Sequence, residues 1–182
     1  MRAPRVRLAA LVAFALLAGV LAFLATRPVE QGATPVDSPL IGTVAPDVVA
    51  QTLAGDHVSL AALRGRVVVL SFFASWCAPC RAEAPNLVAF AWHAHVTRSR
   101  TDLFGVIFGD SDAAVTAFAH SVGLTYPILE DPSGAIANDF GVDALPVNVV
   151  IDARGRVTEV LQGPATTSQL VAAADQAMRA PA

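Results

Sequence analysis

Residues 66–85 read RVVVLSFFASWCAPCRAEAP, an apolar run followed closely by both cysteines of the chain. The run from Arg66 to Phe73 is rich in β-branched and aromatic side chains, a pattern typical of a buried central strand. Cys77 and Cys80 then stand three positions apart, at the start of a helix that we predict over about residues 78–96. A strand that leads into two cysteines at this spacing predicts a redox-active pair.

The two thiols are expected to play different roles. The unpaired backbone N–H groups in the first turn of a helix favour a thiolate. Cys77, placed before the helix and therefore expected to be exposed, is thus the candidate nucleophile near neutral pH. Cys80 lies one turn inside the predicted helix and can resolve a mixed disulfide formed on Cys77. Pro79 between them suits a first helical turn, where a residue needs no N–H partner.

Three other interpretations of the pair stay open at this point. A purely structural disulfide would close so short a loop that it contributes only about 2 kcal/mol to stability. A zinc site could include His93 and His95, but residues at i and i+2 of a helix do not share a face, and the usual histidine spacing in such sites is wider. The third interpretation is two inert, buried thiols.

The segment from Phe72 to Pro85 resembles the active-site segment of the TlpA/ResA/CcmG (DsbE-like) family of membrane-anchored thioredoxin-like proteins, whose pattern is F-W/F-A-x-W-C-x-P-C-R-x-E-x-P. The resemblance implies an α/β thioredoxin fold, with a central mixed sheet flanked by helices and a helix–strand insertion of the TlpA type between residues 111 and 132. It covers residues 42–180, and its matching segments are 42–46, 58–60, 72–85, 140–146 and 150–155.

The remaining secondary structure is predicted from periodicity, turn residues and capping signals. Ser111 can cap one helix, and Thr166 with Gln169 has the spacing of a capping box before an amphipathic last helix. The predicted strands are 103–108, 126–129, 147–151 and 156–161, and the predicted helices are 112–120, 133–140 and one that follows residue 166.

The resemblance also implies roles for residues outside the cysteine pair. Leu145-Pro146 matches the family's cis-proline, which lies beside the two cysteines and offers backbone groups to an extended substrate. Trp76 is expected to cover the disulfide and contact the substrate. Glu83 matches an acid that would tune the thiols or shuttle a proton, although an acid favoured by a helix N-terminus explains it equally well. The resemblance implies no cofactor other than the redox-active Cys77–Cys80 disulfide, and it implies no metal.

Two positions depart from the family pattern. Ser71 stands six residues before Cys77, where thioredoxins have a buried Asp that assists proton transfer, so this chain lacks that route. Val147 follows Pro146, where much of the group has Thr or Glu. The second departure puts a narrow assignment to the cytochrome c maturation subfamily in doubt.

The N-terminus predicts a membrane anchor. Residues 8–25 carry no charge, and as a helix they would span about 27 Å, close to the hydrocarbon core of a bilayer at about 30 Å. Three arginines precede this run, so the positive-inside rule keeps the N-terminus in the cytoplasm and places the rest of the chain outside. The alternative is a cleaved signal peptide, which would leave a secreted or periplasmic domain.

The rest of the chain divides into a tether and one domain. Residues 26–41 hold three prolines and a glycine among small and polar residues and are predicted to form a flexible linker to a domain over residues 42–182. From residue 42 onward eight arginines and no lysine oppose thirteen acidic residues, a net charge of −5. This balance leaves no basic patch for nucleic acid, which excludes nucleic-acid binding as a partner class.

These features predict an extracytoplasmic thiol–disulfide oxidoreductase that reduces disulfides in exported proteins. Glutathione and thioredoxin do not keep thiols reduced outside the cytoplasm, so such an enzyme needs a supply of electrons. The resemblance implies an integral-membrane electron donor of the DsbD/CcdA type, and apocytochrome c is a candidate target during cytochrome c maturation.

Two alternative functions are considered. A disulfide-forming oxidase would use the same motif and fold, because direction depends on reduction potential. A copper-binding Sco-like assembly protein belongs to another class; that group has a CxxxC pair plus a distal histidine, whereas this chain has CxxC and no histidine after His120.

Overall fold

The computed structural model describes residues 13, 14, 16–19 and 32–180, and its contacts divide the chain into two units, residues 1–30 and 31–182. Most of the anchor predicted over residues 1–25, and the first part of the predicted linker, lie outside the described residues. Within the part of the chain that the structure describes, no helix combines the length and the apolar character needed to cross a membrane.

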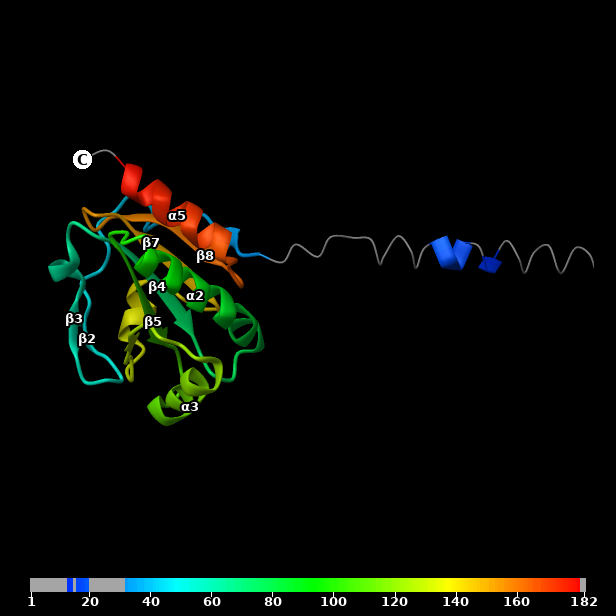
Figure 1. Cartoon of the computed structure of the whole chain (residues 1–182), viewed down its shortest axis with the longest axis horizontal. Helices are drawn as coiled ribbons and strands as arrows, with labels where there is room; N and C mark the ends of the chain where they lie inside the picture. Colours follow the sequence, from blue (N-terminus) through cyan, green and yellow to red (C-terminus); the bar gives the residue numbers. More distant parts are fainter. Residues whose placement is uncertain (1–12, 15, 20–31, 181–182) are drawn as a thin grey trace, which may run out of the picture. The chain divides into compact units, whose positions relative to one another are not determined.

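The second unit is built on a six-stranded mixed sheet with the strand order β1-β8-β7-β4-β5-β6 (Figure 1). β4 lies at its centre, parallel to β5 and antiparallel to β7, and all seven of its residues are buried, as the apolar run predicts. The strands are β1 (Thr34–Pro35), β4 (Val67–Phe73), β5 (Thr101–Ile107), β6 (Ile128–Leu129), β7 (Val147–Ile151) and β8 (Val157–Gln162). A separate hairpin of β2 (Val49–Gln51) and β3 (His57–Ser59) leads into the 3₁₀ helix η1 (Leu60–Leu63).

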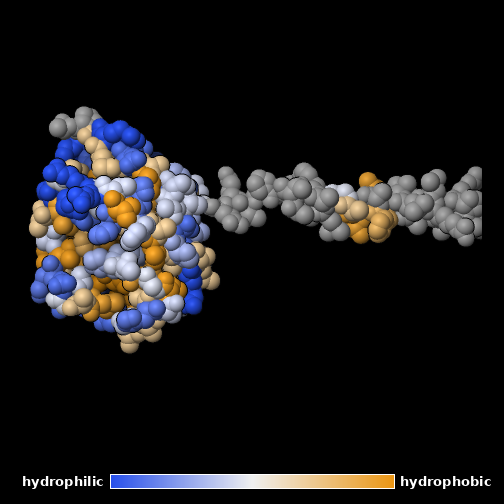
Figure 2. Space-filling model, in the orientation of Figure 1, coloured by the Kyte–Doolittle hydropathy of each residue, from blue (hydrophilic) through white to orange (hydrophobic). Residues whose placement is uncertain are grey.

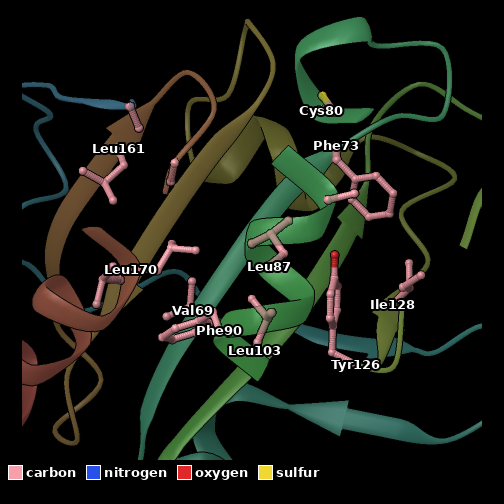
Figure 3. Packing of buried hydrophobic residues seen from close by; sticks show 14 of the residues in the cluster. Val69, Phe73, Cys80, Leu87, Phe90, Leu103, Tyr126, Ile128, Leu161 and Leu170 are labelled. Carbon is pink, nitrogen blue, oxygen red and sulfur yellow. The ribbon is translucent and has the colours of Figure 1, made fainter. Parts of the chain in front are cut away.

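Helices cover both faces of this sheet, because side chains alternate between the two faces along each strand. On one face Val69 and Phe73 of β4 share a core cluster with Leu87 and Phe90 of helix α2 and with Leu170 of helix α5 (Figure 3). On the other face a second cluster takes in residues of η1 and α4. The helices are α2 (Ala78–Val96), α3 (Asp112–Val122), α4 (Ala135–Asp139) and α5 (Thr167–Arg179). The predicted thioredoxin arrangement is confirmed.

The viewed face of this unit carries apolar side chains in separate patches between polar ones (Figure 2). α2 and α5 lie side by side on this face (Figure 1). The α2 residues that face the sheet are buried against it. The first turn of α2 lies close to the end of β4, at one end of the sheet.

The predicted capping box at the start of α5 is present. Thr166 Oγ1 accepts a hydrogen bond from the Gln169 backbone N–H at 3.3 Å, and Gln169 Oε1 accepts one from the Thr166 N–H at 3.0 Å. We expect Thr166→Ala to lower the free energy of unfolding by about 1 kcal/mol, because the Gln169 N–H loses its acceptor, Thr166 Oγ1. Urea denaturation measures this loss, and Thr166→Ser, which keeps the hydroxyl, should restore most of it.

The observed boundaries of some elements differ from the predicted ones where contacts between distant segments determine them. The linker was expected to run to residue 41, but Thr34 and Pro35 pair with β8 as strand β1 and the Val36 N–H donates to Val160 O at 2.9 Å. Val36 and Leu40 also pack against the second core cluster, so the folded unit begins before residue 42. The helix expected over 133–140 is shorter, and the strand expected over 126–129 is reduced to β6.

Candidate active site

The cysteine pair lies between the end of β4 and the start of α2. Cys77 is the N-cap residue of α2, and its sulfur forms a disulfide with Cys80, with an S–S distance of 2.06 Å and a Cα–Cα distance of 5.3 Å. The backbone N–H of Cys80 donates to Cys77 Sγ at 3.2 Å. A negative charge on this sulfur would therefore face an N–H group in the first turn of a helix, as the chemistry of an attacking thiolate requires.

The expected exposure of Cys77 is wrong for this oxidised form. Cys77 is 5% exposed and Cys80 is 2% exposed, and both belong to the core cluster that contains Phe73 and Ala74. The reason is the disulfide itself, which holds the Cys77 sulfur against the sulfur of a residue inside the helix. Figure 3 shows Cys80 at the start of α2. Both cysteines of the oxidised pair are therefore buried.

The histidines proposed for a zinc site lie far from the cysteines. His93 and His95 are exposed residues in the last turn of α2, and His93 is sixteen residues after Cys77. At 1.5 Å per residue this places them about 24 Å along the helix from the pair. The structure therefore does not bring these residues together. Within the described residues, no group of three or more histidine, cysteine or acidic side chains is arranged to hold a metal.

The loop that precedes the cysteines is fixed by the loop after β5. Asp110 accepts hydrogen bonds from the backbone N–H groups of Ser75 at 2.7 Å and Ser111 at 2.8 Å. Burial alone would raise the pKa of Asp110, but hydrogen bonds from Ser75 and Ser111 outweigh it and hold the pKa below its ordinary value. Trp76 is 62% exposed and its indole N–H donates to Gly109 O at 3.2 Å. Trp76 thus presents an open aromatic face beside the pair.

The Leu145–Pro146 peptide bond is cis, as the family resemblance implies. Pro146 immediately precedes β7, whose first residue, Val147, pairs with Phe72 near the end of β4. The bond therefore lies at the same end of the sheet as the cysteine pair. Leu145 packs against both core clusters, and Pro146 O accepts a hydrogen bond from the Gly163 N–H at 2.9 Å.

Glu83 is fully buried, one turn after Cys80 on α2. Its Oε1 accepts hydrogen bonds from Asn148 Nδ2 at 2.7 Å and from the Ala165 backbone N–H at 2.8 Å. Burial raises the pKa of Glu83 to about 7, although the hydrogen bonds from Ala165 and Asn148 act in the opposite direction. The alternative interpretation of Glu83, a solvent-exposed acid that only stabilises the helix N-terminus, does not fit a fully buried side chain. Glu83 is instead a buried acid whose charge changes near neutral pH.

Sequence reasoning did not assign a role to two neighbours of Glu83. Asn148 has a fully buried side-chain amide within β7. The sequence gives one sign of its importance, which is that it is the polar residue inside the apolar run Val147–Ile151. Tyr126 is buried in the same core cluster as the cysteines; burial, followed by the charge of Glu83, raises its pKa. Asn148 contacts the acid directly.

Comparison with known proteins places this site in a family. The profile of the AhpC/TSA family matches residues 41–160. The thiol–disulfide oxidoreductase ResA of Geobacillus thermodenitrificans is 32% identical over 130 residues, which cover 71% of this chain and 74% of that protein. ResA of Bacillus subtilis is 30% identical over 129 residues, which cover 71% of each chain.

A solved structure supports the same assignment to thiol–disulfide oxidoreductases. A secreted disulfide oxidoreductase of Mycobacterium tuberculosis, homologous to E. coli DsbE, superposes with a TM-score of 0.63 at 27% identity, covering 71% of this chain and 95% of that one. Each of these proteins is named for exchange between thiols and disulfides, the chemistry for which Cys77 and Cys80 are placed. The chain belongs to the AhpC/TSA family and, like its ResA relatives, is a thiol–disulfide oxidoreductase with a thioredoxin fold.

Proposed function

We propose that this oxidoreductase works outside the cytoplasm as a reductase of disulfides in exported proteins. The observation that carries the proposal is the Cys77–Cys80 pair at the N-terminus of α2, with a backbone N–H directed at the Cys77 sulfur. The ResA relatives and the secreted M. tuberculosis oxidoreductase support it. The apolar run over residues 8–25 supports an anchor or export signal.

The reaction is a pair of thiol–disulfide exchanges. The Cys77 thiolate attacks one sulfur of the substrate disulfide, a bond forms between Cys77 and that sulfur, and the other substrate sulfur leaves as a thiolate that takes up a proton. The Cys80 thiol then loses its proton and attacks the Cys77 sulfur, which releases the second substrate thiol. Two electrons pass from the dithiol to the substrate, and the enzyme ends with the Cys77–Cys80 disulfide.

The substrate would bind across the rim formed by Trp76, Leu145 and Pro146. The exposed Trp76 ring offers a flat apolar surface, and the cis-proline segment lies at the same end of the sheet as the disulfide. An extended peptide lying on this rim would bring its disulfide to Cys77. Candidate substrates are exported proteins with a disulfide to be opened, apocytochrome c among them.

Glu83 is the proposed acceptor of the Cys80 proton. A buried carboxyl whose pKa is about 7 can take up or release a proton near neutral pH without a large free-energy cost in either direction. Ser71 stands where thioredoxins have the aspartate that assists proton transfer, so Glu83 is the acid proposed for this step. The reoxidised pair would regain two electrons from an integral-membrane donor of the DsbD/CcdA type.

Trapping and potential measurements test this function. In cells, Cys80→Ala is expected to accumulate mixed disulfides with exported proteins on Cys77, and Cys77→Ser/Cys80→Ala should trap none. The reduction potential of the purified pair should lie nearer to thioredoxin, about −270 mV, than to DsbA, about −120 mV. A potential near the DsbA value would favour the disulfide-forming oxidase. If the double variant trapped the same partners, the proposed exchange through Cys77 and Cys80 would be wrong.

A further inference from the structure

A small polar cluster lies inside the core beneath the cysteine pair. Ser71 of β4 and Asn148 of β7 are directly opposite each other in the sheet, and both are fully buried. Ser71 alternates along β4 with residues that face the other core cluster, so its side chain points to the face covered by α2. Glu83 of α2 reaches this face and bonds to Asn148. Three polar side chains from three elements therefore meet in an otherwise apolar layer.

The hydrogen bonds of this cluster are only partly made. Glu83 Oε1 has two donors, the Asn148 amide and the Ala165 N–H. Three buried atoms have no hydrogen-bond partner among the described residues: Glu83 Oε2, Asn148 Oδ1 and Ser71 Oγ. An unpaired buried polar group costs about 1–3 kcal/mol, so the partners open to these atoms matter to the stability of this part of the core.

These atoms complement one another when the carboxyl carries a proton. A protonated Glu83 with its proton on Oε2 becomes a donor, whereas Asn148 Oδ1, on the amide that already bonds to Oε1, is an acceptor without a partner among the described residues. An ionised Glu83 is stabilised instead by the Asn148 N–H group on Oε1. The Asn148 amide thus offers a donor to the ionised Glu83 carboxylate and an acceptor to the protonated Glu83 carboxyl.

We propose that Asn148 is a positioning residue of the exchange reaction, holding the Glu83 carboxyl in the orientation in which it accepts the proton of Cys80. This inference rests on the proposed role of Glu83. During resolution the S–H bond of Cys80 breaks, its proton moves to Glu83, and the Cys80 sulfur forms the bond to Cys77. Glu83 later returns the proton to solvent or to the released thiolate.

The surroundings of Glu83 leave few other groups that could set its charge. From α2 the titratable groups are the reduced Cys77 and Cys80, and from the segment before β6 it is Tyr126, whose pKa is raised in part by Glu83. β4 and β7 present the neutral Ser71 and Asn148, and the segment before α5 presents the backbone of Ala165. No ion pair of Glu83 exists within the described part of the chain.

A single-turnover reaction with a small aromatic disulfide tests the proposal. The reduced full-length protein releases one coloured thiol when Cys77 attacks and a second when Cys80 resolves, so the two steps give two phases. With Asn148→Leu we expect the second phase to slow about tenfold at neutral pH and its pH profile to move to higher pH, because the carboxyl loses a donor that favours its charged form. The first phase should be unchanged.

A double variant separates positioning from a structural effect. In a Glu83→Gln background, Asn148→Leu should change the second phase by less than about twofold, because there is no carboxyl left to position. Asn86→Leu is the matched control: it removes a side-chain amide of α2 that bonds to Thr167 rather than to Glu83, and it should leave both phases unchanged. If Asn148→Leu does not fold, the isosteric Asn148→Asp replaces it and should also move the profile to higher pH, because two carboxyls then share the site.

Two outcomes would overturn the inference. One is a slowing of both phases by the same factor, and the other is a full Asn148→Leu effect that persists without the Glu83 carboxyl. The small disulfide keeps this test separate from the proposed function. A protein that completes both phases but reduces no exported protein refutes the physiological function and leaves the role of Asn148 intact.

Discussion

Cys77→Ser is expected to lower the rate of disulfide reduction in a protein substrate by about a thousandfold or more, because a hydroxyl is scarcely ionised near neutral pH and forms no disulfide. Cys80→Ala should also stop turnover, but after the first exchange, so that the substrate stays bound to Cys77 through a mixed disulfide. Insulin reduction followed by turbidity measures the first effect, and mass spectrometry of the unreduced protein detects the second.

These two variants serve as controls for each other. Both remove the Cys77–Cys80 bond, whose short loop contributes only about 2 kcal/mol, so both should lose about the same stability. A difference in trapping between them is therefore chemical. Equal trapping by Cys77→Ser and Cys80→Ala would show that the assigned order of attack is wrong.

The features that the sequence predicted well are local ones. The apolar run to Phe73, the cysteine spacing, and the capping box of Thr166 and Gln169 each depend on neighbours within a few residues, and each is present in the structure. The cis bond before Pro146 was expected from the family resemblance alone, because the dipeptide by itself favours trans.

The features that escaped prediction depend on contacts between distant segments. Asn148 is 65 residues from Glu83 in the chain, and Ala165 is 82 residues away. Nothing in the local pattern around Glu83 distinguishes a buried acid from one at a solvated helix start. Strand β1 was missed for the same reason: Thr34 and Pro35 have no strand pattern of their own and pair with β8. Burial of Cys77 follows from the disulfide, which the spacing permits but does not require.

Glu83→Gln is expected to change how the stability of the oxidised protein depends on pH. Burial raises the pKa of Glu83 to about 7 in the folded state from 4.5, so between these values the folded chain binds more protons than the unfolded chain. Stability from this group is therefore fully present below about pH 4.5 and is lost as the pH rises through about 7. Glutamine keeps an oxygen for the Ala165 N–H and has no charge to bury.

The size of this effect follows from the shift in the pKa of Glu83. A pKa raised from 4.5 to about 7 corresponds to about 3 kcal/mol, so Glu83→Gln should gain that much stability relative to the unsubstituted protein between about pH 5 and about pH 8. Urea denaturation of both oxidised proteins at each pH measures the difference. Asp110, Asp152 and Glu159, whose pKa values are also shifted, are common to both proteins, so their contributions cancel. Parallel pH profiles for the two proteins would mean that Glu83 is ionised throughout this range, and it could then no longer be the group that exchanges a proton with Cys80.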